Sequence, residues 1–95
     1  MNHRNYIITK IIDGDSIEVN YKTKIRIANV DVIGPTANQA AVKYLKNHWL
    51  YREVQLIDDP NQINKVVHGE HVKIVIANGI NLSEKLLEFG IRLKF

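Results

Sequence analysis

Three short segments rich in β-branched residues follow one another within the first thirty residues of the chain, separated only by turn residues. They cover residues 6–12, 17–19 and 24–30. The third alternates between apolar and polar side chains, with Ile25 and Ile27 expected inside and Lys24 and Arg26 outside. In the first turn, Gly14 is expected to allow a positive φ. The pattern predicts three consecutive strands that pair as a meander.

Helix and strand signals alternate in the rest of the chain. Helices are expected over about 36–50 and from 81 to 90, and strands over 53–57 and 71–76. Pro35 suits the start of the first helix, and a loop is expected around Pro60 because proline lacks an amide donor. Asn81 with Glu84 resembles a helix cap, and Gly90 is a natural helix end. The second helix would bury Leu82, Leu86 and Phe89.

Three strands, a helix, two strands and a second helix predict a mainly β fold with two helices, in the α+β class. Five short strands with a helix between the third and the fourth are typical of a closed oligonucleotide-binding (OB-fold) barrel. The chain has 95 residues, of which 45% are hydrophobic, and shows no repeat or linker. It is therefore expected to form a single domain over residues 1–95.

Composition excludes several classes of protein. The absence of cysteine removes disulfides and cysteine–zinc sites, and the apolar runs are too short to span a bilayer. The first residues show no signal-peptide core, so a cytoplasmic location is expected. The net charge of +3 is consistent with polyanion binding and is weak support for it.

Three stretches carry a resemblance to a known family. They are Ile12–Ser16, Ile25–Asp31 and Ala77–Gly90. In this order and spacing they resemble the staphylococcal nuclease (thermonuclease, SNase-like) family, whose patterns are D-G-D-T, R-L-x-G-I-D and D-G-x-x-x-N-x-x-L-x-x-x-G. The resemblance implies the same OB-fold barrel and a calcium-dependent cleavage of DNA or RNA.

The resemblance also implies roles for individual residues. Asp15 and Asp31 would be the calcium ligands, with Asp13 as a supporting acid, because a hard cation prefers oxygen ligands. Arg26 would be the first of two arginines that bind the phosphate. A glutamate would activate the attacking water.

Two of the implied catalytic residues are missing. The glutamate position, three residues after Asp31, is occupied by Gly34, and no carboxylate occurs before Glu53. The second arginine position is occupied by Glu70, which reverses the charge. Losing a positioned base costs about 10²–10⁴ in rate and losing a charge-stabilising donor about 10²–10³ more. Efficient cleavage by the family mechanism is not expected.

Each candidate site also has an alternative interpretation. The acidic turn at residues 13–15 is either a weak calcium site or a well-formed turn, and Arg26 either contacts phosphate or forms an ion pair with a nearby Asp. Residues 68–71 (His-Gly-Glu-His) could bind a transition metal, but a solvated loop is favoured. Aromatic pairs could stack on bases, although aromatics at such places more often cover the core. These pairs are Trp49 with Tyr51, and Tyr21 with Tyr6.

Three functions follow from these residues. The leading one is a catalytically impaired nuclease-like domain that binds single-stranded DNA or RNA through a phosphate-tracking stripe. Lys22, Lys24, Arg26, Lys43 and Lys46 would form this stripe, although a solvated face is the alternative. The second is a weak calcium-dependent nuclease that uses Asp15, Asp31 and Arg26. The third is a protein-interaction or inhibitory factor built on the same barrel.

Overall fold

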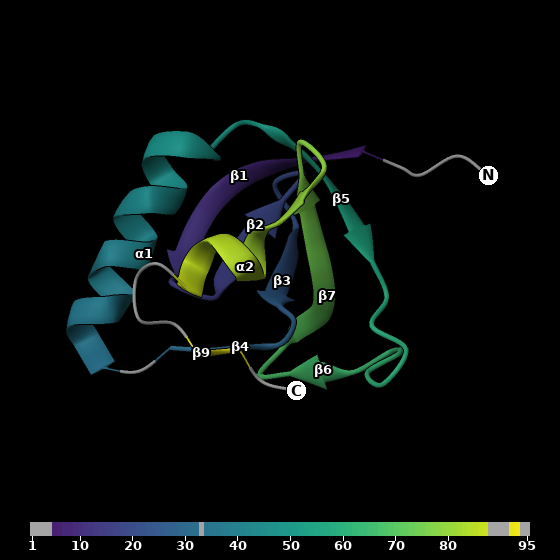
Figure 1. Cartoon of the computed structure of the whole chain (residues 1–95). Coiled ribbons are helices and arrows are strands. Elements are labelled where there is room, and N and C mark those ends of the chain that lie inside the picture. Colours follow the sequence, from purple (N-terminus) through teal and green to yellow (C-terminus); the bar gives the residue numbers. More distant parts are fainter. Residues whose placement is uncertain (1–4, 33, 88–91, 94–95) are drawn as a thin grey trace.

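The computed structural model describes residues 5–32, 34–87 and 92–93 (Figure 1). The elements, in chain order, are β1 (Asn5–Asp13), β2 (Ser16–Val19), β3 (Thr23–Ile27), β4 (Val30–Asp31), α1 (Gly34–His48), β5 (Glu53–Ile57), β6 (Val66–Val67), β7 (Glu70–Ala77), β8 (Ile80–Asn81), α2 (Leu82–Leu86) and β9 (Arg92–Leu93). Within this part of the chain, every strand of four or more residues belongs to one barrel.

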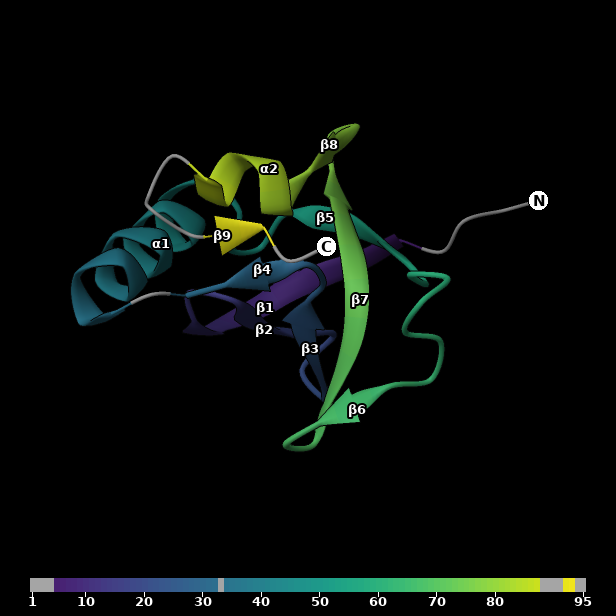
Figure 2. The ribbon, with the colours of Figure 1, turned by 60° about the horizontal axis from the view of Figure 1, so that its bottom comes forward.

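The five long strands form a closed barrel in the order β3-β2-β1-β5-β7. Their neighbours pair antiparallel, and a parallel pairing of β3 with β7 closes the ring, with Arg26 opposite Val72. The short strands β6 and β8 extend β7, and β4 pairs with β9 beside the barrel (Figure 2). This arrangement confirms the predicted mainly β, OB-fold-like barrel with two helices.

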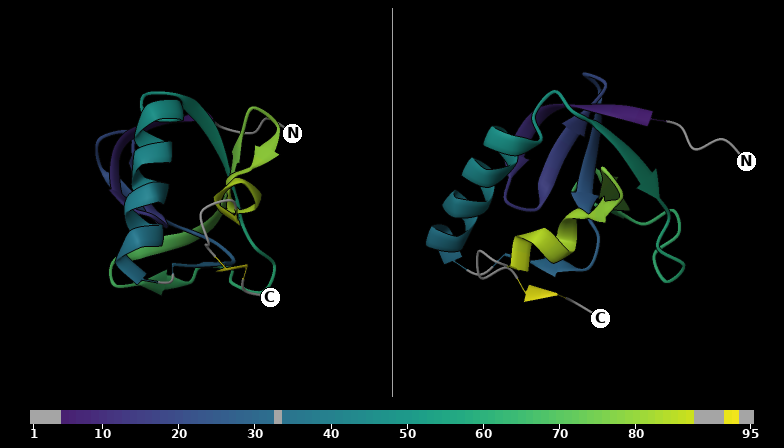
Figure 3. Two further views of the ribbon diagram at one scale, coloured as in Figure 1. Left: turned by 60° about the vertical axis from the view of Figure 1, so that its left-hand side comes forward. Right: turned by 45° about the horizontal axis from the view of Figure 1, so that its top comes forward.

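The core fills the barrel and extends to the two helices. Ile8, Ile17, Ile25, Ile27, Val75, Leu45, Leu82 and Leu86 are almost completely buried. The helix α1 packs against β1 along one side of the barrel (Figure 3). The helix α2 packs against β7 and lies between α1 and β7 in the view of Figure 1. The inward positions expected for Ile25 and Ile27 are therefore confirmed.

Most predicted elements are found, with differences at their ends. The strand expected over 24–30 is broken, because Asn29 has a φ of +67° and turns the chain after β3. The helix α1 begins two residues earlier than expected, at Gly34, whose φ is +80°. The N-cap at Asn81 is confirmed, since its side chain accepts a hydrogen bond from the Ser83 amide. Phe89 and Gly90 lie outside the described residues.

The acidic turn uses Gly14 differently from the prediction. Gly14 is not among the glycines with a positive φ. Its amide instead donates to Asn38 Oδ1 on α1 at 2.8 Å, and a Cβ at this position would lie 3.2 Å from the Ala41 Cβ. The requirement for glycine therefore comes from the close approach of the turn to α1.

No helix among the described residues is long and apolar enough to cross a membrane.

Candidate functional site

Arg26 lies between two carboxylates at the end of the barrel where the acidic turn meets β7. Its Nη1 is 3.0 Å from Asp15 Oδ2, and its Nη2 is 3.3 Å from Glu70 Oε1. The antiparallel register of β2 with β3 sets Ser16 opposite Arg26 and so brings Asp15 close. The parallel pairing of β3 with β7 brings Glu70, the first residue of β7, to the same place.

The two carboxylates are well covered by the protein. The side chains of Asp15 and Glu70 are 12% and 10% exposed, whereas that of Arg26 is 31% exposed. The Ser16 hydroxyl lies 3.1 Å from Glu70 Oε1 and 3.3 Å from Asp15 Oδ1, so it can donate to either. Buried charges of this kind are stable only when they are paired and hydrogen-bonded. The cluster is therefore an internal structural network.

This network leaves little positive charge for a phosphate. Both terminal nitrogens of Arg26 face carboxylates, and its Nε is buried without a hydrogen-bond partner. One positive charge is set against two negative ones, so a phosphate approaching Arg26 would meet net repulsion. Burial raises the pKa of Asp15 above its ordinary value, and the nearby Arg26 charge opposes this rise.

The residues expected to bind calcium lie in different surroundings in the described part of the chain. Asp15 is paired with Arg26, and Asp13 is exposed at the end of β1. Asp31 lies in β4 opposite Arg92, and its side chain is outside the described residues. Among the described side chains, no group of three or more His, Cys, Asp or Glu residues could hold a metal ion. Calcium binding stays a prediction from the motifs.

The two positions that depart from the family pattern differ in their surroundings. Gly34 is exposed at the start of α1 and offers no carboxylate. Glu70 was expected in a solvated loop with His68 and His71, and this is wrong for Glu70, which is buried at the start of β7. His68 and His71 are exposed, as expected. Strand alternation turns Glu70 inward while His71 faces solvent.

A groove of about 460 Å³ lies next to Arg26 and is bordered by the loop that follows β5. In this loop Asp59 Oδ1 accepts a hydrogen bond from the Asn61 amide at 3.0 Å, and Oδ2 accepts one from Gln62 Nε2 at 2.9 Å. The Asn61 amide, followed by the Gln62 side chain, lowers the pKa of Asp59. Lys65 also lines the groove and is exposed, so a variant at this lysine can test this end of the barrel.

The Asp59 turn predicts a pH effect on stability. Because the folded pKa lies below the ordinary value of 3.8, the ionised form contributes stability above that pH and loses it as the pH falls through the lowered pKa. Asp59→Asn should therefore be less stable than the wild type at pH 7 and close to it at pH 2. Urea unfolding at both values would measure this, and an equal difference at the two pH values would contradict it.

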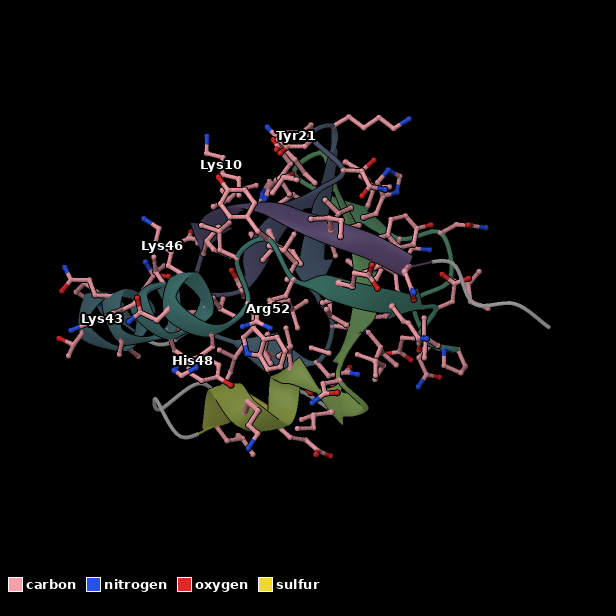
Figure 4. All side chains as sticks on the ribbon, turned by 90° about the horizontal axis from the view of Figure 1, so that it is seen from above. Lys10, Tyr21, Lys43, Lys46, His48 and Arg52 are labelled. Carbon is pink, nitrogen blue, oxygen red and sulfur yellow. The ribbon has the colours of Figure 1, made fainter. Side chains whose placement is uncertain are left out.

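The lysines of the predicted stripe lie on two separate elements. Lys22 and Lys24 are exposed at the β2–β3 hairpin, and Lys43 and Lys46 are exposed on α1. Arg26 does not join them, because it is held in its ion pairs. Figure 4 shows Lys43 and Lys46 extending from α1, with Lys10 of β1 beyond them. Sequence reasoning missed Lys10, because its neighbours in the chain give no sign that β1 packs against α1.

No protein-family model matches this chain, and no curated protein sequence matches it. The resemblance to staphylococcal nuclease thus stays an expectation from the three motifs.

Proposed function

We propose that this chain is a nucleic-acid-binding module on a nuclease-like barrel that lacks an efficient cleavage site. The proposal rests on one observation. The arginine at the family's phosphate position is held by Asp15 and Glu70, whereas Lys10, Lys43 and Lys46 form no ion pair with any described residue. Phosphate binding would therefore occur away from the position where the family cleaves.

The site residues support the loss of cleavage. Gly34 supplies no base to activate water, and Glu70 replaces a cation with an anion. Together these changes would cost about 10⁴ or more in rate by the family mechanism. The Arg26 ion pairs add a further obstacle, because a substrate phosphate would have to displace buried carboxylates from the guanidinium.

The charge of α1 supports binding. No carboxylate occurs in this helix of fifteen residues, while Lys43 and Lys46 are exposed one turn apart. In the described part of the chain neither lysine forms an ion pair, and neither does Lys10. Unpaired lysines on one side of a small domain are suited to the repeating charge of a phosphate backbone.

The test is fluorescence anisotropy of an end-labelled single-stranded DNA, with calcium and with chelator. We expect anisotropy to rise in both buffers and the affinity to weaken as salt is added. A calcium-dependent fall below the starting value would mean cleavage and would favour the weak nuclease, in which case Asp31→Ala should abolish it. No change in either buffer would contradict the proposal and would favour a protein partner.

The double variant Lys43→Ala/Lys46→Ala should lower the affinity for single-stranded DNA by about tenfold at 0.1 M salt. The slope of log K against log salt should fall by about 1.4, since each lost phosphate contact on a single strand contributes roughly 0.7. Lys65→Ala, at the groove beside Arg26, is the matched comparison and should bind like the wild type. If Lys65→Ala lowers the affinity more than the double variant does, the ligand binds at the end of the barrel that holds Arg26.

A further inference from the structure

Two tyrosines are exposed to solvent in a backbone conformation that bulky residues rarely adopt. Tyr21 is 76% exposed with a φ of +61°, and Tyr51 is 65% exposed with a φ of +64°. The other described non-glycine residues with positive φ are Asn20, Asn29, Asn64, His68 and Asn78. Asparagine and histidine tolerate this region, whereas a tyrosine there is strained. Glycine would adopt the same backbone conformation with less strain. The conformation of these turns therefore does not explain why tyrosine occupies them.

The backbone amides of both tyrosines donate hydrogen bonds to neighbouring residues of β1. The Tyr51 amide donates to the Ile8 carbonyl at 2.7 Å, and the Tyr21 amide donates to Thr9 Oγ1 at 2.9 Å. Tyr51 immediately precedes the part of the chain that pairs with one edge of β1, and Tyr21 follows β2, which pairs with the other edge. The two residues therefore flank β1, about two strand spacings apart, or roughly 10 Å.

Positive charge lies next to Tyr21, on the strand that both tyrosines flank and on α1. In the view from above, Tyr21, Lys10, Lys46 and Lys43 follow one side of the molecule in that order (Figure 4). All three lysines are exposed. Glu18 lies opposite Lys10 in the pairing of β1 with β2. Its carboxylate accepts a hydrogen bond from the Thr9 hydroxyl at 2.9 Å, so it helps to hold the Tyr21 anchor. We call Tyr21, Tyr51, Lys10, Lys46 and Lys43 the tyrosine–lysine surface.

We infer that the tyrosine–lysine surface binds single-stranded nucleic acid, with bases stacked on Tyr21 and Tyr51 and phosphates on the lysines. This inference rests on the proposed function and names its site and its ligand. Exposed aromatic rings beside a line of cations are the two parts of a single-strand site. A duplex would be bound more weakly, because its base faces are already stacked inside the helix. The barrel end that holds Arg26 is not used.

The test compares Tyr21→Gly and Tyr51→Gly with the wild type. Because glycine accepts a positive φ, each variant should have a melting temperature equal to or above that of the wild type. Each should nevertheless bind a fluorescent single-stranded oligonucleotide about five- to a hundredfold more weakly, the loss typical of one stacked base. Tyr21→Phe and Tyr51→Phe keep the ring and should retain the affinity. Ile63→Ala removes an exposed apolar side chain elsewhere and should also bind normally.

The outcomes separate this inference from the proposed function. Wild-type affinity in both glycine variants, with binding still weakened in Lys43→Ala/Lys46→Ala, would overturn the stacking site and leave the binding module intact. Equal affinity of the wild type for a duplex of the same length would also overturn it. No binding by the wild type itself would refute the proposed function and, with it, this inference. Weaker single-strand binding by glycine variants that melt at or above the wild-type temperature would support both.

Discussion

Arg26→Ala is expected to lower the free energy of unfolding by about 2–3 kcal/mol at pH 7. Removing one member of a buried ion pair costs 3–5 kcal/mol because the remaining charge is left uncompensated, and the partial exposure of Arg26 reduces that figure. Here two carboxylates, Asp15 and Glu70, would lose their partner. Urea unfolding would measure the loss. Lys24→Ala, on the same strand but exposed, is the control and should change stability by less than about 0.5 kcal/mol.

The pH dependence shows whether charge causes this loss. The folded pKa of Asp15 is already raised above 3.8 by burial, and removing Arg26 removes the charge that opposes the rise. A carboxyl with a raised pKa contributes stability that is fully present below 3.8 and is lost as the pH rises through the folded pKa. The destabilisation of Arg26→Ala should therefore be smaller at pH 4 than at pH 7. Equal losses at the two values would indicate lost packing of the arginine stem instead.

Gly14→Ala is expected to destabilise the fold by about 2 kcal/mol. The added Cβ would lie 2.7 Å from Asn38 Oδ1 and 3.2 Å from the Cβ of the buried Ala41. Asn38 could rotate away only by giving up its hydrogen bond from the Gly14 amide, and Ala41 cannot move without shifting α1. Thermal and urea unfolding would measure the change.

A double-mutant cycle identifies the source of that loss. Asn38→Ala alone should cost about 1–2 kcal/mol, because it leaves the Gly14 amide without its partner. If the two residues act through this contact, Gly14→Ala/Asn38→Ala should cost clearly less than the sum of the single variants. Additive losses would mean that the contact with Ala41 dominates.

Local sequence patterns predicted much of the fold. The strand at 53–57, the cap at Asn81 and the burial of Leu82 and Leu86 are found where they were expected. These features depend on residues close together in the chain. The break at Asn29 was missed because asparagine adopts a positive φ only in some contexts, and strict alternation up to Ile27 concealed the turn.

The candidate site was less predictable. The motifs identified Arg26, and the alternative of an ion pair with a nearby Asp agrees with its contact to Asp15. The second contact was missed, because Glu70 was expected in a loop and lies 44 positions further along the chain. The tyrosine–lysine surface was missed as a unit, since Tyr21 and Tyr51 meet β1 from opposite sides.

The sequence by itself determined the order of the elements, the apolar side of most of them and the absence of a carboxylate at Gly34, because periodicity and residue type are local properties. The tertiary structure alone decided which charges are neutralised and which stay available. Closure of the barrel through the parallel β3–β7 pair sets Glu70 against Arg26, and the packing of α1 on β1 leaves Lys43 and Lys46 facing solvent. Electrostatic pairing depends on distances between residues far apart in the chain, and only the closed barrel sets those distances.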